Sequence, residues 1–318
     1  MRVGRWLAAA LLGTTLAGCQ DPAPVTVWSA PSSPSPSMPV TSAPPPAPSA
    51  RPSPSPAAVV VPAGVLAGIA VFDRQAGTFL VAQRTSARFR SASLVKLLIA
   101  LDYLWNRGPG YTVPAADRPK LDVMLRSSDD NAATYFWDRD GRDAIVTRMV
   151  GRLGLKDTQP PSAAGRTGWG ITGLSAADVV RVYRYLLDTA PAPVRGYVMG
   201  NLHQSTPCGT DRYNQTFGIP SAFTRPWAAK QGWHGFGDTP ANPCVSGSPA
   251  AAPAPGPVVA AAGILDGAVL HTTGTVGDGD RVIVVVLTQH PTGTPFSRAV
   301  SELTKLVRSL PVPGGVPV

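Results

Sequence analysis

The chain has 318 residues, enough for one large folded domain or two smaller ones. Its formal net charge is +9, but the arginines are scattered along the sequence instead of gathered in one stretch. This distribution gives little support to nucleic-acid binding, whereas a basic exported protein suits an anionic cell wall or membrane surface. The histidines show no metal-ligand spacing, so neither a metal site nor a cofactor is predicted.

Residues 1–19 have the parts of an export signal. A basic start and an apolar run too short to cross a bilayer as a mature helix are followed by Cys19. Residues 16–19 (Leu-Ala-Gly-Cys) resemble the lipobox of bacterial lipoproteins, which are cleaved before a cysteine that carries diacylglycerol. The resemblance implies that Cys19 is lipidated and that the exported protein is anchored to the outer face of the bacterial cell membrane. An ordinary signal peptide with an incidental cysteine is the alternative.

Residues 20–62 are rich in proline, serine and alanine and cannot bury a core, so they are predicted to form a disordered, extended tether. The folded domain is predicted over residues 63–318. Of the three cysteines, Cys208 and Cys244 remain as a pair once Cys19 is lipidated. In an oxidising compartment these two are predicted to form a disulfide that closes a long loop.

Hydrophobic periodicity in the folded part predicts strands at both ends and helices between them. A hairpin is predicted around residues 74–77, and the segment Arg88 to Leu104 predicts a helix with Ser93 in its first turn. Ser175 is predicted to cap a later helix. Further helices are predicted over 117–126, 143–153, 193–203 and 295–310, a loop over 156–173, and strands over 225–235, 258–277 and 280–289. This order predicts an α/β (α+β) fold in which both chain ends form one antiparallel sheet around an inserted helical region.

Three short motifs lie within this framework. Residues 93–96 (Ser-Leu-Val-Lys) open a predicted helix, residues 128–130 (Ser-Asp-Asp) follow another, and residues 230–232 (Lys-Gln-Gly) lie on a predicted strand. The first motif places a serine nucleophile and a lysine base one helical turn apart. A serine and a lysine at this spacing also open many helices for capping and solubility alone.

In this order the motifs resemble the SxxK, SxN and K(T/S)G motifs of class A β-lactamases and penicillin-binding serine D,D-peptidases, over residues 65–310. The resemblance implies that Ser93 attacks an amide carbonyl and that neutral Lys96 takes its proton. Ser128 would relay a proton to the leaving nitrogen, and Lys230 would hold the Ser128 hydroxyl and attract the substrate carboxylate. Alternatively, Ser128 only caps a helix and Lys230 is a solvated strand lysine.

The family also implies a substrate-binding strand. The backbone N–H groups of Ser93 and Trp233 would form the oxyanion hole, and Gly232 would let the substrate backbone approach closely. Gln231 stands where the family has a hydroxyl residue, which weakens a contact expected to the substrate carboxylate. Asp130 stands where the family has asparagine, so either Asp130 contacts the substrate amide or the turn is remodelled to present Asn131.

The deacylating glutamate of class A β-lactamases has no counterpart in the sequence. The single glutamate is Glu302, far outside the interval from Ser93 to Lys230, and Asp157 is only a weak substitute in the relevant loop. The expected function is therefore that of an exported, membrane-anchored, monomeric serine hydrolase. It would act through an acyl-serine on peptidoglycan-type D-Ala peptides or β-lactams, with poor deacylation. A catalytically degenerate cell-envelope binding or scaffold lipoprotein is the alternative, and an α/β-hydrolase is disfavoured because no G-x-S-x-G occurs.

Overall fold

The computed structural model describes residues 58–237, 239–245 and 267–318. The predicted lipidation site Cys19, the predicted signal segment and most of the predicted tether lie outside the described residues, as does the first half of the strand predicted over 258–277. Residues 58–62, at the end of the predicted tether, form neither helix nor strand.

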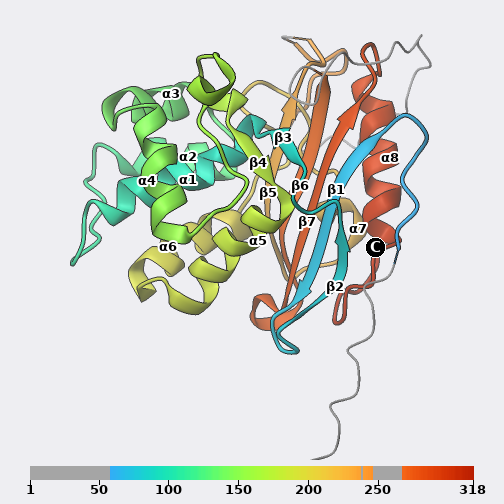
Figure 1. Ribbon diagram of the computed structural model, residues 1–318, viewed down its shortest axis with the longest axis horizontal. Coiled ribbons are helices and arrows are strands. Elements are labelled where there is room, and N and C mark those ends of the chain that lie inside the picture. The colour runs from blue at the N-terminus through green and yellow to red at the C-terminus, as the bar shows by residue number, and fades with distance from the viewer. Residues whose placement is uncertain (1–57, 238, 246–266) are drawn as a thin grey trace, which may run out of the picture. The chain divides into compact units, whose positions relative to one another are not determined.

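A five-stranded antiparallel sheet lies at the centre of the folded part, with its strands in the order β2-β1-β7-β6-β5 (Figure 1). The strands come from the two ends of the folded part, and the helical region is inserted between them, so the predicted fold class is confirmed. The strands of this sheet are β1 (Leu66–Asp73), β2 (Thr78–Gln83), β5 (Trp227–His234), β6 (Ala268–Val276) and β7 (Val282–His290).

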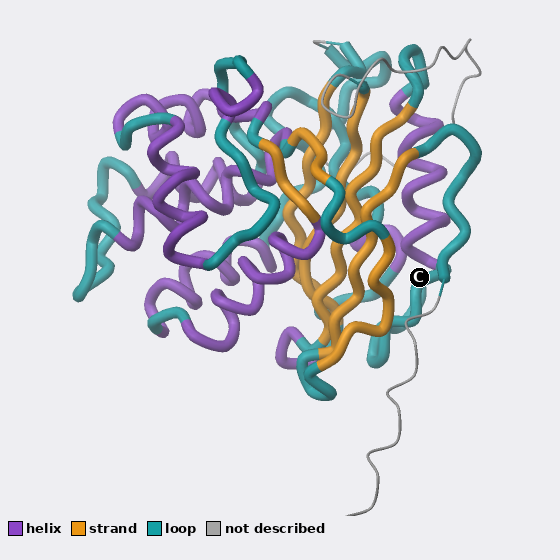
Figure 2. The backbone as a smooth tube through the Cα atoms, viewed as in Figure 1, coloured by secondary structure: helices purple, strands orange, loops and turns teal. Residues whose placement is uncertain are grey.

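Helices cover both faces of the sheet, and the inserted helices lie on one side of it (Figures 1 and 2). On β7, Ile283 and Val285 pack into the core shared with the inserted helices, whereas Val282 and Val284 pack into the core shared with α8. Because β7 is buried on both faces, it reads as an unbroken apolar run. The helices are α1 (Lys96–Trp105), α2 (Arg118–Arg126), α3 (Asp130–Arg139), α4 (Asp143–Leu153), α5 (Ala176–Arg184), α6 (Ala192–His203), α7 (Ile219–Ala222) and α8 (Phe296–Arg308).

The helix predicted within Arg88 to Leu104 is confirmed, with Ser93 in its first turn, because a 3₁₀ turn begins at Ala92 and α1 follows it. The residues before it form the strand β3 (Arg88–Arg90), which pairs with β4 (Gly173–Ser175) in a two-stranded sheet that the sequence did not predict. Ser175 does cap α5 as predicted, because its Oγ accepts a hydrogen bond from the backbone N–H of Asp178 (3.2 Å).

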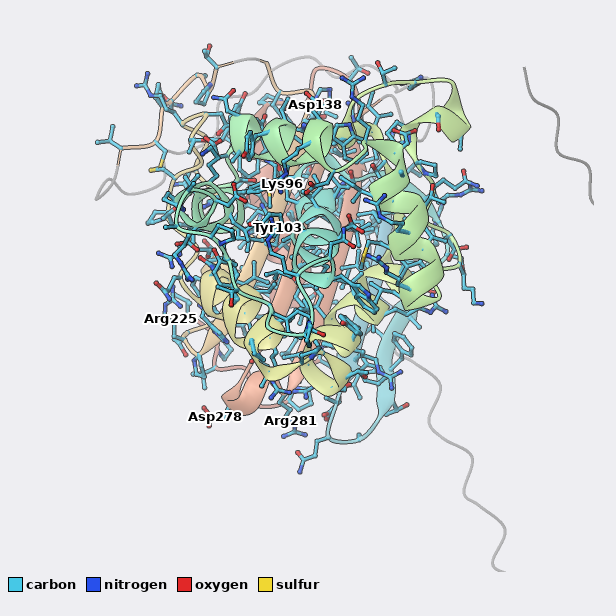
Figure 3. All side chains as sticks on the ribbon, turned by 90° about the vertical axis from the view of Figure 1, so that its left-hand side faces the viewer. Lys96, Tyr103, Asp138, Arg225, Asp278 and Arg281 are labelled. Carbon is cyan, nitrogen blue, oxygen red and sulfur yellow. A yellow bond between two sulfur atoms is a disulfide. The ribbon has the colours of Figure 1, made fainter. Side chains whose placement is uncertain are left out.

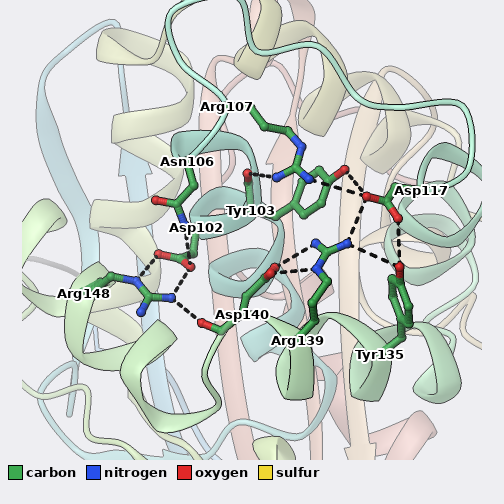
Figure 4. Close-up of polar contacts among 9 residues, drawn as sticks. All are labelled: Asp102, Tyr103, Asn106, Arg107, Asp117, Tyr135, Arg139, Asp140 and Arg148. Atoms are coloured by element: carbon green, nitrogen blue, oxygen red, sulfur yellow. Dashed lines mark hydrogen bonds and ion pairs between the residues drawn. The ribbon is translucent and has the colours of Figure 1, made fainter.

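A network of buried charges fastens α1 to its neighbours (Figure 4). The Asp102 carboxylate of α1 accepts two hydrogen bonds from Arg148 of α4 (2.9 and 2.6 Å). Asp117, just before α2, accepts from the Tyr103 hydroxyl (2.7 Å) and from Arg139 of α3 (3.0 Å). Through Asp117 the network joins the C-terminal ends of α1 and α3, the two helices that begin with site residues.

Candidate active site

Ser93 lies in a tight turn that leads into α1. A short 3₁₀ helix, Ala92–Val95, precedes α1, so Lys96 follows Ser93 by one turn. Ala92 has φ +44°, an uncommon conformation for a residue with a Cβ, and it reverses the chain after β3. The serine side chain is nearly buried, and its oxygen faces the lysine, not solvent.

Lys96 is the centre of the polar contacts. Its Nζ donates to Ser93 Oγ (2.8 Å), to the backbone carbonyl of Ser128 (2.6 Å) and to Asp130 Oδ1 (2.6 Å). The lysine is fully buried, whereas the Asp130 side chain is 64% exposed. Figure 3 shows Lys96 in the middle of the molecule, close to α3. The lysine therefore joins the Ser93 turn to the start of α3.

The second and third motifs meet at the Ser128 hydroxyl. Lys230 Nζ on β5 donates to Ser128 Oγ (2.7 Å) and to its neighbour's carbonyl, that of Gln231 (3.1 Å). Ser128 has φ +59°, which turns its side chain inward, while Asp129 caps α3 by accepting from the Ala132 N–H (2.6 Å). The turn thus uses Asp129 for capping and leaves Ser128 between the two lysines.

Burial lowers the pKa of both lysines, and Lys96 lowers that of Lys230 further. Burial lowers the pKa of Lys96, and the nearby Asp130 carboxylate opposes this shift. Burial, followed by the nearby Lys96, lowers the pKa of Lys230 well below its usual value. Two ammonium groups cannot easily coexist here, so the neutral amine needed for a base becomes accessible.

A cavity of about 260 Å³ opens on the serine and is lined by Ser93, Asp130, Trp169, Asp211 and Trp233, among others. A larger and mainly apolar cavity of about 520 Å³ lies between the end of β5 and the start of α8. The larger cavity contains none of the serines or lysines of the three motifs, so we place the candidate site at the smaller one.

Gly232 and Gln231 make contacts within the protein that the resemblance does not imply. A Cβ at Gly232 would lie 3.1 Å from the Ser91 carbonyl oxygen and 3.3 Å from Leu94 Cγ, so this glycine seats the Ser93 turn directly on β5. The buried Gln231 amide points away and donates to the carbonyls of Phe217 (2.6 Å) and Gln215 (3.2 Å). Gln231 therefore lies outside the cavity.

Of the remaining candidate residues, Asp130 is part of the site and the others lie away from the cavity. Asp130 reaches Lys96, whereas the exposed Asn131 does not line the cavity. Asp157 accepts a hydrogen bond from Ser175 Oγ (3.1 Å) and does not line the cavity either. Glu302 lies on α8, paired with Arg298 (2.8 Å). No carboxylate of the 156–173 loop lines the cavity among the residues that the structure describes.

Two residues of the site were not singled out from the sequence. Trp169, on the 156–173 loop, lies with its ring centre 4.7 Å from Lys96 Nζ and donates through Nε1 to Thr134 Oγ1 (3.1 Å). Asp211 accepts a hydrogen bond from Trp233 Nε1 (2.8 Å). Neither belongs to a recognised motif; the only signal for Asp211 was its place in the loop that the predicted disulfide closes.

The predicted disulfide between Cys208 and Cys244 is confirmed, with 5.6 Å between the Cα atoms. The backbone N–H of Cys244 also donates to the carbonyl of Arg212 (2.7 Å). The bridge thus holds residues 239–245 against the turn that contains Asp211.

No protein-family model matches the chain. A protein of Mycobacterium tuberculosis named "Putative lipoprotein LppW" is 36% identical over 253 residues, which cover 78% of this chain and 70% of that protein. The Mycobacterium bovis protein of the same name gives the same values. The chain belongs to the LppW family. In the described ranges of this LppW-family protein, no helix is both long and apolar enough to cross a membrane.

Solved structures show which fold this LppW-family protein has. The β-lactamase of Streptomyces albus G is 17% identical with a TM-score of 0.52, and the match covers 77% of this chain and 92% of that chain. A mutant of PBP-A, in its acyl-enzyme complex with penicillin G, is 14% identical with a TM-score of 0.54, covering 77% and 89%. At these identities the likeness establishes the β-lactamase/transpeptidase-like fold alone, as the motifs predicted.

Proposed function

We propose that this LppW-family protein is an acyl-serine enzyme of the cell envelope that forms an acyl-enzyme readily and releases it slowly. The single observation that carries the proposal is the chain of contacts from Ser93 Oγ through Lys96 to Ser128 and Lys230. These residues come from distant parts of the chain, and a structural role alone does not require two buried lysines to share one serine.

Acylation follows from these contacts. Ser93 Oγ attacks the carbonyl carbon while its proton passes to neutral Lys96, 2.8 Å away. When the carbon–nitrogen bond breaks, the Ser128 hydroxyl gives its proton to the leaving nitrogen and is reprotonated from Lys96. The N–H groups of Ser93 and Trp233 would stabilise the oxyanion, as the family resemblance implies. The product is a serine ester and a free amine.

Deacylation lacks its usual base. Water must attack the ester, break its carbon–oxygen bond and return a proton to Ser93, which requires a group that activates the water. Trp169, on the 156–173 loop, lies beside Lys96, and an indole cannot accept that proton. Asp157 is held by Ser175 away from the cavity. Slow deacylation is the expected consequence.

The proposed substrates are peptidoglycan-type D-Ala peptides or β-lactams. PBP-A, which shares the fold, has been captured as an acyl-enzyme with penicillin G. The test is the intact mass of the full-length protein after incubation with penicillin G. Because the leaving nitrogen of a β-lactam stays attached, the proposal expects a gain equal to the whole penicillin mass, lasting for hours and absent in Ser93→Ala. The absence of an adduct with any of a panel of β-lactams and D-Ala thioesters would remove the proposal.

The second candidate is a binding or scaffold protein that retains the fold without turnover. The Asp130–Lys96 contact of 2.6 Å favours it, because a carboxylate stabilises the protonated lysine, which cannot act as a base. Saturable binding of a D-Ala peptide without any covalent adduct would support this candidate over the enzyme.

The lipid anchor is part of the proposal. The name of the mycobacterial relative and the Leu-Ala-Gly-Cys sequence before and at Cys19 support it. Residues 20–62 would then separate the domain from the membrane by on the order of 100 Å. Cys19→Ala should move the protein from the membrane fraction to the soluble one, and unchanged membrane retention would contradict the anchor.

A further inference from the structure

The charged groups of the cavity do not match a substrate carboxylate. Two carboxylates, those of Asp130 and Asp211, line the cavity that opens on Ser93. Arg90 lines it too, but its Nε is directed at the carbonyl of Gly170, on the loop that contains Trp169 (3.5 Å). The cavity lining thus includes two acidic side chains, those of Asp130 and Asp211.

Asp211 lies on the side where a leaving group would depart. The backbone N–H of Thr210 donates to the carbonyl of Ser127 (2.9 Å), which places the Asp211 turn directly beside the Ser128 turn. In the proposed mechanism the Ser128 hydroxyl protonates the leaving group. The group that leaves Ser93 therefore passes next to Asp211.

Asp211 is held in place before any ligand arrives. One carboxylate oxygen accepts from Trp233 Nε1 (2.8 Å) and the other from the Tyr213 N–H (3.2 Å). A Cβ at Gly209 would lie 2.6 Å from the carboxylate and 2.9 Å from the Trp233 ring, so this glycine lets the two side chains pack together. A carboxylate held beside a partly exposed indole suits an ammonium group. The ammonium donates a charge-assisted hydrogen bond to the carboxylate and makes a cation–π contact with the face of the indole ring.

The groups expected to hold a carboxylate are engaged elsewhere. The Gln231 amide donates to two backbone carbonyls on the other face of β5. Lys230 is 1% exposed and already donates to Ser128 and Gln231, and burial lowers its pKa well below the usual value. An anionic leaving group would therefore meet the carboxylate of Asp211, and Lys96, a cation that acts on Asp211, already pairs with Asp130 (2.6 Å).

We infer that the cavity is specific for acyl donors whose leaving group carries a primary ammonium, bound by Asp211 and Trp233, and that it disfavours a leaving group with a free carboxylate. The inference rests on the proposed acyl-serine function and narrows its substrates: D-Ala peptides or amides that release a diamine-type or basic amine should acylate Ser93 faster than donors whose leaving group keeps a carboxylate, such as penicillin G. Asp211 is the specificity-determining residue.

Matched acyl donors test it. Phenylacetyl-glycyl-D-alanine thioesters of 4-aminobutanethiol, butanethiol and 4-mercaptobutyrate have leaving groups of similar length and similar thiol acidity that are cationic, neutral or anionic. The rate of acyl-enzyme formation on the full-length protein is followed by intact mass. The 4-aminobutanethiol ester should acylate Ser93 about tenfold faster than the 4-mercaptobutyrate ester, the gain expected of one well-placed ion pair.

Asp211→Asn keeps an oxygen for Trp233 and removes the charge, so it should bring the rate ratio close to one. Asp278→Asn is the matched control, because this exposed aspartate lies at the lower edge of the molecule, away from Lys96 (Figure 3). A preference for the 4-mercaptobutyrate ester, or a ratio unchanged by Asp211→Asn, would overturn the inference while leaving the acyl-serine function intact.

If none of the thioesters acylates Ser93, the binding of matched amides tests the ammonium site instead. Ser93→Ala is titrated with phenylacetyl-glycyl-D-alanine amides of ethylenediamine and of glycine, and the Trp fluorescence is recorded. Tighter binding of the ethylenediamine amide, lost on adding Asp211→Asn, supports the ammonium site even without turnover. Equal binding of the two amides, or tighter binding of the glycine amide, overturns it.

Discussion

The Asp130 carboxylate lies 2.6 Å from the ammonium of Lys96, at the position where the family resemblance implies a neutral asparagine amide. An amide there can orient the lysine without favouring its protonated form, whereas a carboxylate does both. Burial lowers the pKa of Lys96 and Asp130 raises it, so one surface-exposed side chain opposes the formation of the base. Burial and Asp130 therefore act in opposite directions on the fraction of Lys96 that is neutral.

Asp130→Asn should make acylation faster and extend it to lower pH. Removing the carboxylate lowers the pKa of Lys96, so the neutral amine persists further into acid. Below that pKa, each unit by which it falls raises the neutral fraction about tenfold. The measurement is the rate of penicillin G acylation between pH 5 and pH 9, in which the acid limb of the profile should move to lower pH.

Asp138→Asn is the control for this prediction. Asp138 lies on the same helix, is exposed and pairs with Arg142 (2.8 Å), so its removal changes the net charge equally without touching Lys96. A change in the plateau rate with no movement of the acid limb would show that Asp130 acts on the substrate and not on the lysine.

Gly232→Ala should misplace the nucleophile. The new Cβ would press on the Ser91 carbonyl and on Leu94, both fixed in the turn that holds Ser93. Because these neighbours must give way by less than the displacement of about 1 Å that costs a hundredfold, acylation should fall by about tenfold, with a loss of about 1–3 kcal/mol in the free energy of unfolding.

Gly196→Ala provides the comparison. Gly196 lies inside α6 with open space around its Cα, so alanine there should stabilise the helix and leave acylation unchanged. Wild-type acylation by Gly232→Ala would mean that the turn on β5 tolerates a Cβ and that the close approach has no role in positioning Ser93.

The sequence was sufficient to predict the sheet, most helices and the grouping of Ser93, Lys96, Ser128 and Lys230. Periodicity, capping residues and motif order are local signals. They predict the structure correctly wherever the apolar residues of the pattern are also the buried ones. The strand β3 was missed because three residues carry no period and its partner β4 lies about eighty residues away. Long-range pairing of this kind has no local sequence signal.

The sequence could not predict where isolated side chains point. Gln231 is predicted to contact the substrate because it stands at the hydroxyl position of the family's third motif, but its amide is directed at the carbonyl of Phe217 in the core on the α8 side. Trp169 and Asp211 reach the cavity through loop conformations fixed by Thr134 and by the Trp233 indole. Such contacts are properties of the folded structure alone.

Asp178→Asn should loosen the loop that contains Trp169. The buried Asp178 Oδ2 accepts from the N–H groups of Asp157 (2.7 Å) and Thr158 (2.8 Å) and from the Thr158 hydroxyl (2.8 Å). An asparagine would turn an N–H₂ group toward some of these donors and leave them unsatisfied, at a cost of about 3 kcal/mol in unfolding free energy. Urea denaturation measures this loss.

Asp188→Asn is the corresponding surface change, since Asp188 is exposed and bonds Arg74 at 2.7 Å. Its effect should stay below about 1 kcal/mol. Equal effects of the two substitutions would mean that the Asp178 contacts contribute no more than a surface ion pair.

The disulfide should stabilise the protein and preserve the Asp211 turn. The bridge spans a sequence separation of 36 residues, for which loop-closure entropy gives about 3–4 kcal/mol. Replacing both Cys208 and Cys244 by serine should lower the free energy of unfolding by about this amount and reduce any rate difference between the cationic and anionic thioesters, because the Asp211 turn loses its tether. Reductant should reproduce both effects in the native protein and add nothing to the double variant. If reduction lowers stability but leaves the thioester ratio intact, then the hydrogen bonds of Asp211 to Trp233 and Tyr213 suffice to hold the carboxylate, and the bridge serves stability alone.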